Sequence, residues 1–172
     1  HDAPAYFQEE RIHHERFHCI PDYSVIQACG HNILCVGGAI SIDRDYRKKL
    51  DSRHPRFGVA SYWADEMPVY DEEALNDISK KLQIDTVITH TAPSFCELIL
   101  KDGLTEWAEL DPDIPVDCAR EREIMDQIFT HLKSAEHPVS HWYYGHFHQS
   151  WSSEIDDILF SMLDILEFKE IR

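Results

Sequence analysis

The sequence is poor in basic residues and has no long apolar run. Lys and Arg number 16 against 32 Asp and Glu, which gives a formal net charge of −16. Nucleic-acid backbones are bound by clustered Lys and Arg, and anionic membrane surfaces attract the same residues, so this charge disfavours both partners. No apolar stretch approaches the roughly 20 residues of a membrane-spanning helix. We therefore expect neither nucleic acid nor a membrane as a partner.

Cysteine is present, but not in a pattern that builds a scaffold. The five cysteines are an odd number, and no two of them have the Cys-x-x-Cys spacing. This pattern argues against a disulfide framework and against a thiolate zinc site. It is typical of a protein in a reducing compartment, and we expect a cytoplasmic location.

Hydrophobic periodicity predicts alternating strands and helices, and therefore an α/β fold class. At 172 residues, the chain is long enough for one domain with its own core. The elements we expect are strands over 23–28 and 33–36 joined as a hairpin by a turn over 29–32, a helix over 71–82, a strand that ends at His90, an exposed loop over 105–115, a helix over 117–133 and two closing strands within 155–172. Asp71 is expected to cap the first helix. The inward face of the second helix is expected to carry Ile124, Met125, Ile128 and Leu132.

Two histidines follow a glycine after an apolar run. His146 and His148 come after Trp142-Tyr143-Tyr144 and Gly145. In an extended backbone, side chains two positions apart share a face and could reach one metal, or two neighbouring metals. The alternative is a strand end with two solvent-facing histidines. Gly145 would allow a turn at positive φ.

A third histidine ends a separate β-branched run. His90 follows Thr86-Val87-Ile88-Thr89, which is typical of a buried strand, and Pro93 comes shortly after it. Polar residues at the carboxyl ends of such strands are where α/β sheets usually bind ligands. Three histidines on two strand ends therefore indicate a metal site.

These segments resemble a known family. Gly-His-Phe-His at 145–148 and Thr-His-Thr-Ala-Pro at 89–93 are similar to the last two motifs of the calcineurin-like metallophosphoesterases. Residues 37–44 resemble a segment of bacterial members, and His-Asp at 1–2 resembles the tail of the Gly-Asn-His-Asp motif. The resemblance implies a sandwich of two mixed β-sheets flanked by helices. It also implies hydrolysis of phosphate esters, as in serine/threonine phosphatases.

The family's earlier motifs have no counterpart here. Those motifs supply metal-binding aspartates, a histidine and an asparagine. We therefore expect residues 1–172 to be the C-terminal portion of a single metallophosphoesterase domain whose N-terminal part is missing. A sheet without those strands should have an unpaired edge, which invites another chain. A homo-oligomer or an N-terminal fragment is expected to complete the sheet.

The resemblance also implies roles for individual residues. It assigns His90 and His146 to one metal and His148 to the other, and it makes His1 a candidate catalytic residue that stabilises the transition state or protonates the leaving group. Histidine and carboxylate ligands suit Mn, Fe or Zn, so two such divalent ions are the expected cofactors. The expected substrate is a phosphate ester on a small molecule or a phosphoprotein.

One basic cluster stands out in this acidic chain, over residues 41–53. A solvated helix face is one interpretation. The other is a rim that receives the phosphate of the substrate. Arg44 is then the candidate substrate-binding residue, because a guanidinium matches phosphate geometry.

Two alternatives from other functional classes remain. One is a non-catalytic protein-interaction module on the same fold with an incomplete metal site. The other is a plain zinc-binding domain that uses His90, His146, His148 and one carboxylate, since three protein ligands and a water make a workable zinc site. Metal stoichiometry and turnover of a phosphate ester distinguish the three hypotheses.

Overall fold

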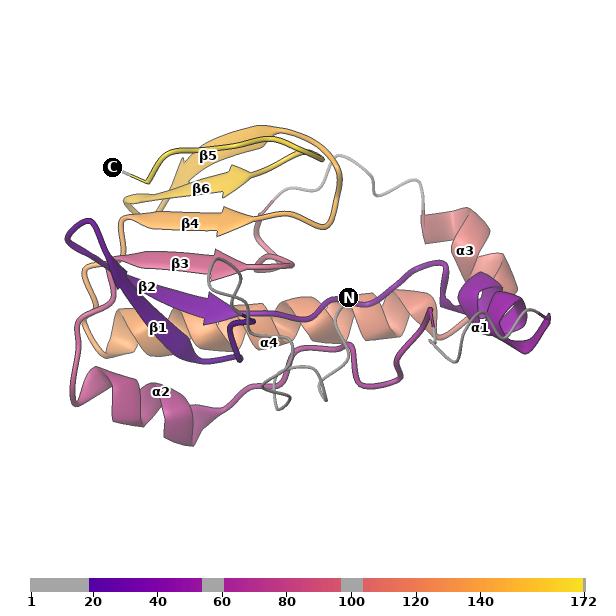
Figure 1. Cartoon of the computed structure of the whole chain (residues 1–172), viewed down its shortest axis with the longest axis horizontal. Helices are drawn as coiled ribbons and strands as arrows, with labels where there is room; N and C mark the ends of the chain where they lie inside the picture. Colours follow the sequence, from indigo (N-terminus) through magenta and orange to yellow (C-terminus); the bar gives the residue numbers. More distant parts are fainter. Residues whose placement is uncertain (1–18, 54–60, 97–103, 172) are drawn as a thin grey trace.

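A computed structural model describes residues 19–53, 61–96 and 104–171, which form one six-stranded mixed sheet and four helices (Figure 1). The strands are β1 (Ser24–Ala28), β2 (His31–Val36), β3 (Thr86–Thr89), β4 (His141–Tyr144), β5 (Trp151–Ile155) and β6 (Ile158–Met162). Their order across the sheet is β1-β2-β3-β4-β6-β5. The four central strands are parallel, and β1 and β5 pair antiparallel at the two edges. The predicted α/β class is confirmed.

Both edge strands are joined to their neighbours by two-residue hairpins. Cys29 and Gly30 link β1 to β2 with φ angles of 52° and 88°. Asp156 and Asp157 link β5 to β6 with φ angles of 53° and 63°. Positive φ at both central residues matches the twist of the flanking strands, and Gly, Asn and Asp tolerate it best. The predicted first hairpin is confirmed, but its turn is shorter than the expected 29–32, because His31 and Asn32 pair with β1 as part of β2.

The prediction of two closing strands within 155–172 is wrong in its bounds. The last hairpin spans 151–162, and no strand follows Met162 in the described chain. In β5, the half-buried Trp151, Ser153 and Ile155 alternate with exposed residues. This edge strand has too few apolar residues to stand out in the sequence, because only one of its faces is covered.

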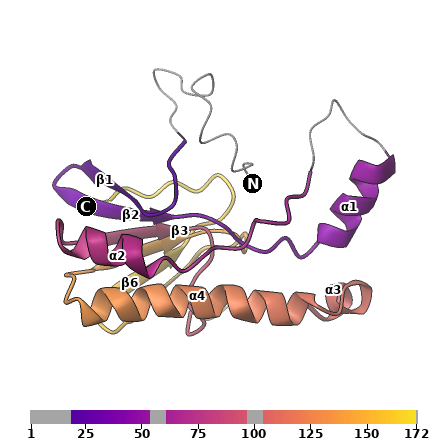
Figure 2. The same cartoon turned by 90° about the horizontal axis from the view of Figure 1, so that it is seen from below.

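Helices α2 (Glu72–Ser79) and α4 (Ile114–Ser134) cover one face of the sheet (Figure 2). The Asp71 side chain caps α2 by accepting a 2.8 Å hydrogen bond from the Ala74 backbone N–H, as its position before the apolar stripe predicts. The core lies between this face and the two helices. Its fully buried large side chains include Leu34, Leu75, Met125, Ile128, Leu132, Trp142, Tyr144 and Phe160.

Helices α1 (Arg44–Arg53) and α3 (Leu104–Leu110) lie beyond the carboxyl ends of the parallel strands (Figure 1). The prediction of an exposed loop over 105–115 is therefore wrong. The Asp111 N–H closes the last turn of α3 on Trp107 O at 2.9 Å, and α4 begins at Ile114. Pro115 does not interrupt α4, because the first turn of a helix has no acceptor for its missing N–H.

The segment after β6 turns back along the sheet. Lys169 Nζ donates a 2.9 Å hydrogen bond to Ser161 Oγ and lies 5.9 Å from the centre of the Tyr143 ring. Described residues form a single sheet, so the two-sheet sandwich stays a prediction. Within the described ranges, no helix combines the length and apolar character needed to cross a membrane.

Candidate functional site

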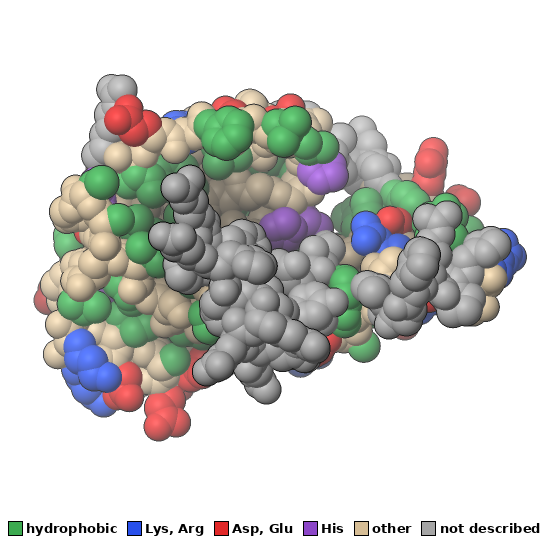
Figure 3. Space-filling model, in the orientation of Figure 1, with side chains coloured by type: hydrophobic (Ala, Val, Ile, Leu, Met, Phe, Trp, Pro, Cys, Tyr) green, Lys and Arg blue, Asp and Glu red, His purple; other side chains and the backbone are tan. Residues whose placement is uncertain are grey.

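His90 and His146 meet at the carboxyl edge of the parallel strands. His90 follows β3 and His146 follows β4, and these two strands are adjacent and parallel. The Gly145 N–H donates to the His90 carbonyl at 3.1 Å, which joins the two strand ends. The ring centroids lie 5.1 Å apart with the planes inclined at 62°. Histidine side chains border a hollow on this face of the molecule (Figure 3). This edge is where ligands of open α/β sheets usually bind.

The backbone that carries His146 and His148 is a turn, so the expected extended strand is wrong at this point. Strand β4 ends at Tyr144, and the Phe147 N–H donates to Gly145 O at 2.8 Å across His146. His146 and His148 have positive φ angles of 69° and 53°, whereas Gly145 does not. Such turns centred on a non-glycine residue are strained and cluster at functional sites. The tight turn, and not a strand pleat, sets the direction of the His146 ring.

Crowding keeps this pair of imidazoles neutral. Burial, together with charge repulsion from the neighbouring His90 and His148, lowers the pKa of His146 to about 4. Desolvation by the surrounding chain also lowers the pKa of His90, although this residue is exposed at the surface, and the charge of His148 adds to the effect. A neutral imidazole presents the nitrogen lone pair that a metal ligand needs. At neutral pH, the pair is therefore ready to bind a metal without first losing a proton.

The described residues fit only part of a metal centre. His148 is exposed, and it lies close enough for its charge to lower the pKa of both His90 and His146. Imidazoles suit a divalent ion such as Zn, Fe or Mn, but a two-metal site also needs carboxylates to bridge the ions. Among the described residues, no group of three or more His, Cys, Asp or Glu side chains converges as a metal site. The predicted catalytic residue His1 and its neighbour Asp2 lie outside the described residues.

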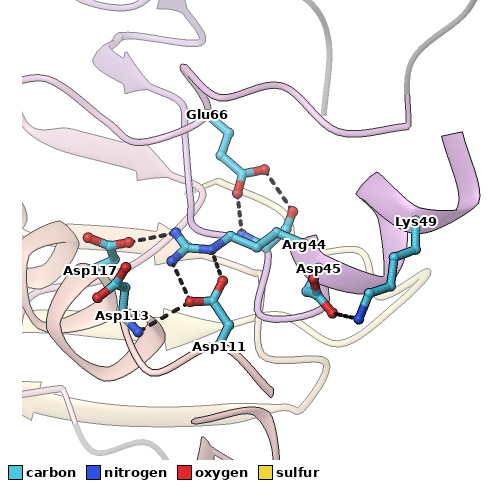
Figure 4. Close-up of polar contacts among 8 residues, drawn as sticks. Arg44, Asp45, Lys49, Glu66, Asp111, Asp113 and Asp117 are labelled. Carbon is cyan, nitrogen blue, oxygen red and sulfur yellow. Dashed lines mark hydrogen bonds and ion pairs between the residues drawn. The ribbon is translucent and has the colours of Figure 1, made fainter. Parts of the chain in front are cut away.

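Arg44, the predicted substrate-binding residue, is occupied by two carboxylates (Figure 4). Its Nε and Nη2 donate to Asp111 at 2.7 and 3.2 Å, and its Nη1 donates to Asp117 at 2.5 Å. The Asp111 hydrogen bond contributes most to raising the pKa of Arg44, against the opposing effect of burial. Only 8% of Arg44 is exposed. A phosphate would have to displace these carboxylates, so the binding role of Arg44 stays a prediction.

The structure adds two buried carboxylates that sequence reasoning missed. Glu121 of α4 and Glu66 are 2% and 8% exposed, and they hold consecutive residues of the loop after β2. A signal for Glu121 exists in the sequence. Glu121, Met125 and Ile128 are spaced by four and three residues, so the glutamate lies on the apolar stripe of its own helix.

Comparisons with known proteins assign no family to this chain. No protein-family model matches the chain, and no curated protein matches it.

Proposed function

We propose that this chain carries the histidine part of a metal-dependent phosphoesterase site of the calcineurin-like type, in a domain that forms a two-sheet sandwich. The observation that carries the proposal is the His90–His146 pair, held at the ends of adjacent parallel strands with ring centroids 5.1 Å apart. His90 and His146 would hold one divalent ion, and His148 would bind a second. When bound, such ions lower the pKa of a water and stabilise charge on phosphate oxygens.

The chain's own residues prepare the site. The low pKa of His146 leaves its ring neutral under conditions where an isolated histidine is partly protonated. The strained turn at residues 145–148 fixes where the ring points. The proposed substrate is a phosphate ester on a small molecule or a peptide, because the net charge of −16 disfavours long nucleic acid.

A second candidate function is a non-catalytic interaction module. It is favoured by the absence of a complete metal-binding group among the described residues. Carboxylates from a further chain segment or from a second copy would convert this incomplete centre into the proposed enzyme. We therefore propose that residues 1–172 alone hold at most one ion firmly and hydrolyse phosphate esters poorly.

One experiment separates these functions. The purified chain is loaded with Mn²⁺ or Zn²⁺, its bound metal is counted, and turnover of a chromogenic phosphate ester is measured. Weak turnover that disappears in His90→Ala and His146→Ala, but persists in His141→Ala at the other end of β4, supports the phosphoesterase. Metal binding without turnover, even when an N-terminal fragment is added, would support the interaction module instead.

A further inference from the structure

Two loops bind the buried carboxylate of Glu121, which a helix holds between them. Its Oε2 accepts a 2.5 Å hydrogen bond from the Ile40 backbone N–H, in the loop after β2. Its Oε1 accepts a 2.5 Å hydrogen bond from the Thr91 hydroxyl, in the loop after β3. The glutamate itself belongs to α4, which packs beneath the sheet (Figure 2). One side chain thus joins the loops of two neighbouring parallel strands at the edge where His90 lies.

We propose that Glu121 is a positioning residue that ties these two loops together and so holds His90 against His146. The proposal rests on the function proposed above for the role of the site. The placement of the histidines is a structural property that can be measured without metal or substrate.

The path from Glu121 to His90 is short and hydrogen-bonded throughout. Thr91 directly follows His90 and is fixed by Glu121. Thr89 directly precedes His90, and its hydroxyl donates to the Thr91 carbonyl at 2.5 Å. The Trp142 indole N–H donates to the Thr89 hydroxyl at 2.9 Å, which connects the turn to β4. His90 is therefore held between two threonines whose side chains are both engaged.

The loop after β2 is held from both sides. Glu66 accepts from the Ser41 N–H at 2.6 Å and from the Ser41 hydroxyl at 2.7 Å, while Glu121 holds the preceding residue, Ile40. Gly38 has a φ of 87°, and an added Cβ would lie 2.8 Å from the Pro68 nitrogen. This loop cannot shift easily, so it is a firm anchor through which Glu121 fixes the loop after β3.

A buried carboxylate is a costly way to fill a core position. Removing a charge from water is unfavourable unless hydrogen bonds compensate for it. Burial raises the pKa of Glu121 to about 7, and the negative charge of Glu66 acts in the same direction. The hydrogen bonds from Thr91 and Ile40 and the charge of Arg122 oppose this rise. An apolar side chain would avoid the cost but could not bind both loops, which favours a positioning role.

The test measures the His90–His146 contact directly, by the nuclear Overhauser cross-peak between the two rings in the metal-free chain at neutral pH. Glu121→Ala removes both acceptors, and we expect the cross-peak to be lost. Glu121→Gln keeps an oxygen for Ile40 and an NH₂ group for Thr91, so the cross-peak should return. Thr91→Val removes only the link to the β3 loop and should weaken the contact even if Glu121→Ala does not fold.

Ile128→Ala is the matched control for lost stability. Ile128 lies fully buried on the same face of α4, two turns from Glu121, and packs in the hydrophobic core. We expect this variant to be destabilised while its ring cross-peak persists. An unchanged cross-peak in both Glu121→Ala and Thr91→Val would overturn the proposal, and so would equal loss in Ile128→Ala. Phosphate-ester turnover does not enter these outcomes, so failure here is distinguishable from failure of the proposed function.

Discussion

Histidines occupy both ends of the parallel strands, but their surroundings differ. At the amino end, His31 Nδ1 lies 2.7 Å from Asp85 Oδ1, so a protonated ring has an anionic partner. At the carboxyl end, His90 and His146 pack against each other, and burial lowers the pKa of both. The His31 ring is bound to a carboxylate, whereas the lowered pKa values of His90 and His146 favour neutral rings that can bind a metal.

This difference explains why the carboxyl end of the strands is a candidate metal site and the amino end is not. Asp85 also accepts hydrogen bonds from the Asn32 N–H and the Thr86 hydroxyl, so it is a structural link between β2 and β3. Burial opposes ionisation of Asp85, but these hydrogen bonds and His31 outweigh it and lower the pKa of the carboxyl. The hydrogen-bonded Asp85 carboxylate stabilises the sheet. The neutral rings of His90 and His146 keep nitrogen lone pairs that can bind a ligand.

The largest expected effect is a pH-dependent loss of folding stability caused by His146. Its folded pKa of about 4 lies below the ordinary 6.5, so the unfolded chain binds more protons between these values and stability falls as pH falls. His146→Gln should therefore become more stable relative to the parent protein on acidification, by up to about 3 kcal/mol. Urea unfolding of the metal-free chain at several pH values measures this difference.

The matched replacement at the other end is His31→Gln. His31 contacts the Asp85 carboxylate and does not pack against another histidine, so this variant should not show the gain in acid expected for His146→Gln. If both variants gave the same pH dependence, the contrast between the two ends of the sheet would be wrong.

Removal of Asp85 should have the next largest effect. Asp85→Ala leaves the Asn32 N–H without its 2.7 Å acceptor, and we expect a loss of about 2 kcal/mol in the free energy of unfolding at neutral pH. Because the folded pKa of Asp85 is lowered, its contribution is present above the unfolded value and is lost as pH falls through the folded value. Equal destabilisation at neutral pH and well below the folded pKa would contradict this account.

Replacing histidines at the two ends of the strands should change metal affinity differently, with a smaller free-energy effect than the changes above. We expect His90→Ala and His148→Ala to weaken binding of Zn²⁺ or Mn²⁺ by about tenfold or more, which is about 1.4 kcal/mol. Circular dichroism should show that both variants stay folded. His141→Ala, at the amino end of β4, should retain the parent affinity in isothermal titration calorimetry. Unchanged metal content in His90→Ala and His148→Ala would refute the ligand assignment.

The smallest expected effect concerns Arg44, at the outer rim of the carboxyl end. Arg44→Lys cannot reproduce the bonds to Asp111 and Asp117 together, and we expect a loss of about 1 kcal/mol in stability. If Arg44 also binds substrate phosphate, KM should rise in this variant while kcat changes little. Asp117→Asn is the control, because it weakens the ion pair without removing the guanidinium.

Some features were predictable because they depend on neighbours in sequence. The cap at Asp71 is confirmed, and so is the first hairpin, although its turn is shorter than the expected 29–32. The inward placement of Met125, Ile128 and Leu132 in α4 is also confirmed. The loop predicted over 105–115 was wrong, because its two prolines lie where helices tolerate them: Pro112 between α3 and α4, and Pro115 in the first turn of α4. The β5 strand was missed because one of its faces is exposed.

The sequence by itself determined that polar residues follow two apolar strands, since periodicity and β-branched runs act over a few positions. Only the tertiary structure decided that β3 and β4 are adjacent and parallel, which brings His90 to His146. The capture of Arg44 by Asp111 and Asp117, and the joining of Ile40 to Thr91 through Glu121, are likewise tertiary. These contacts join residues more than 25 positions apart, so strand order and helix packing set them, and no local pattern encodes either.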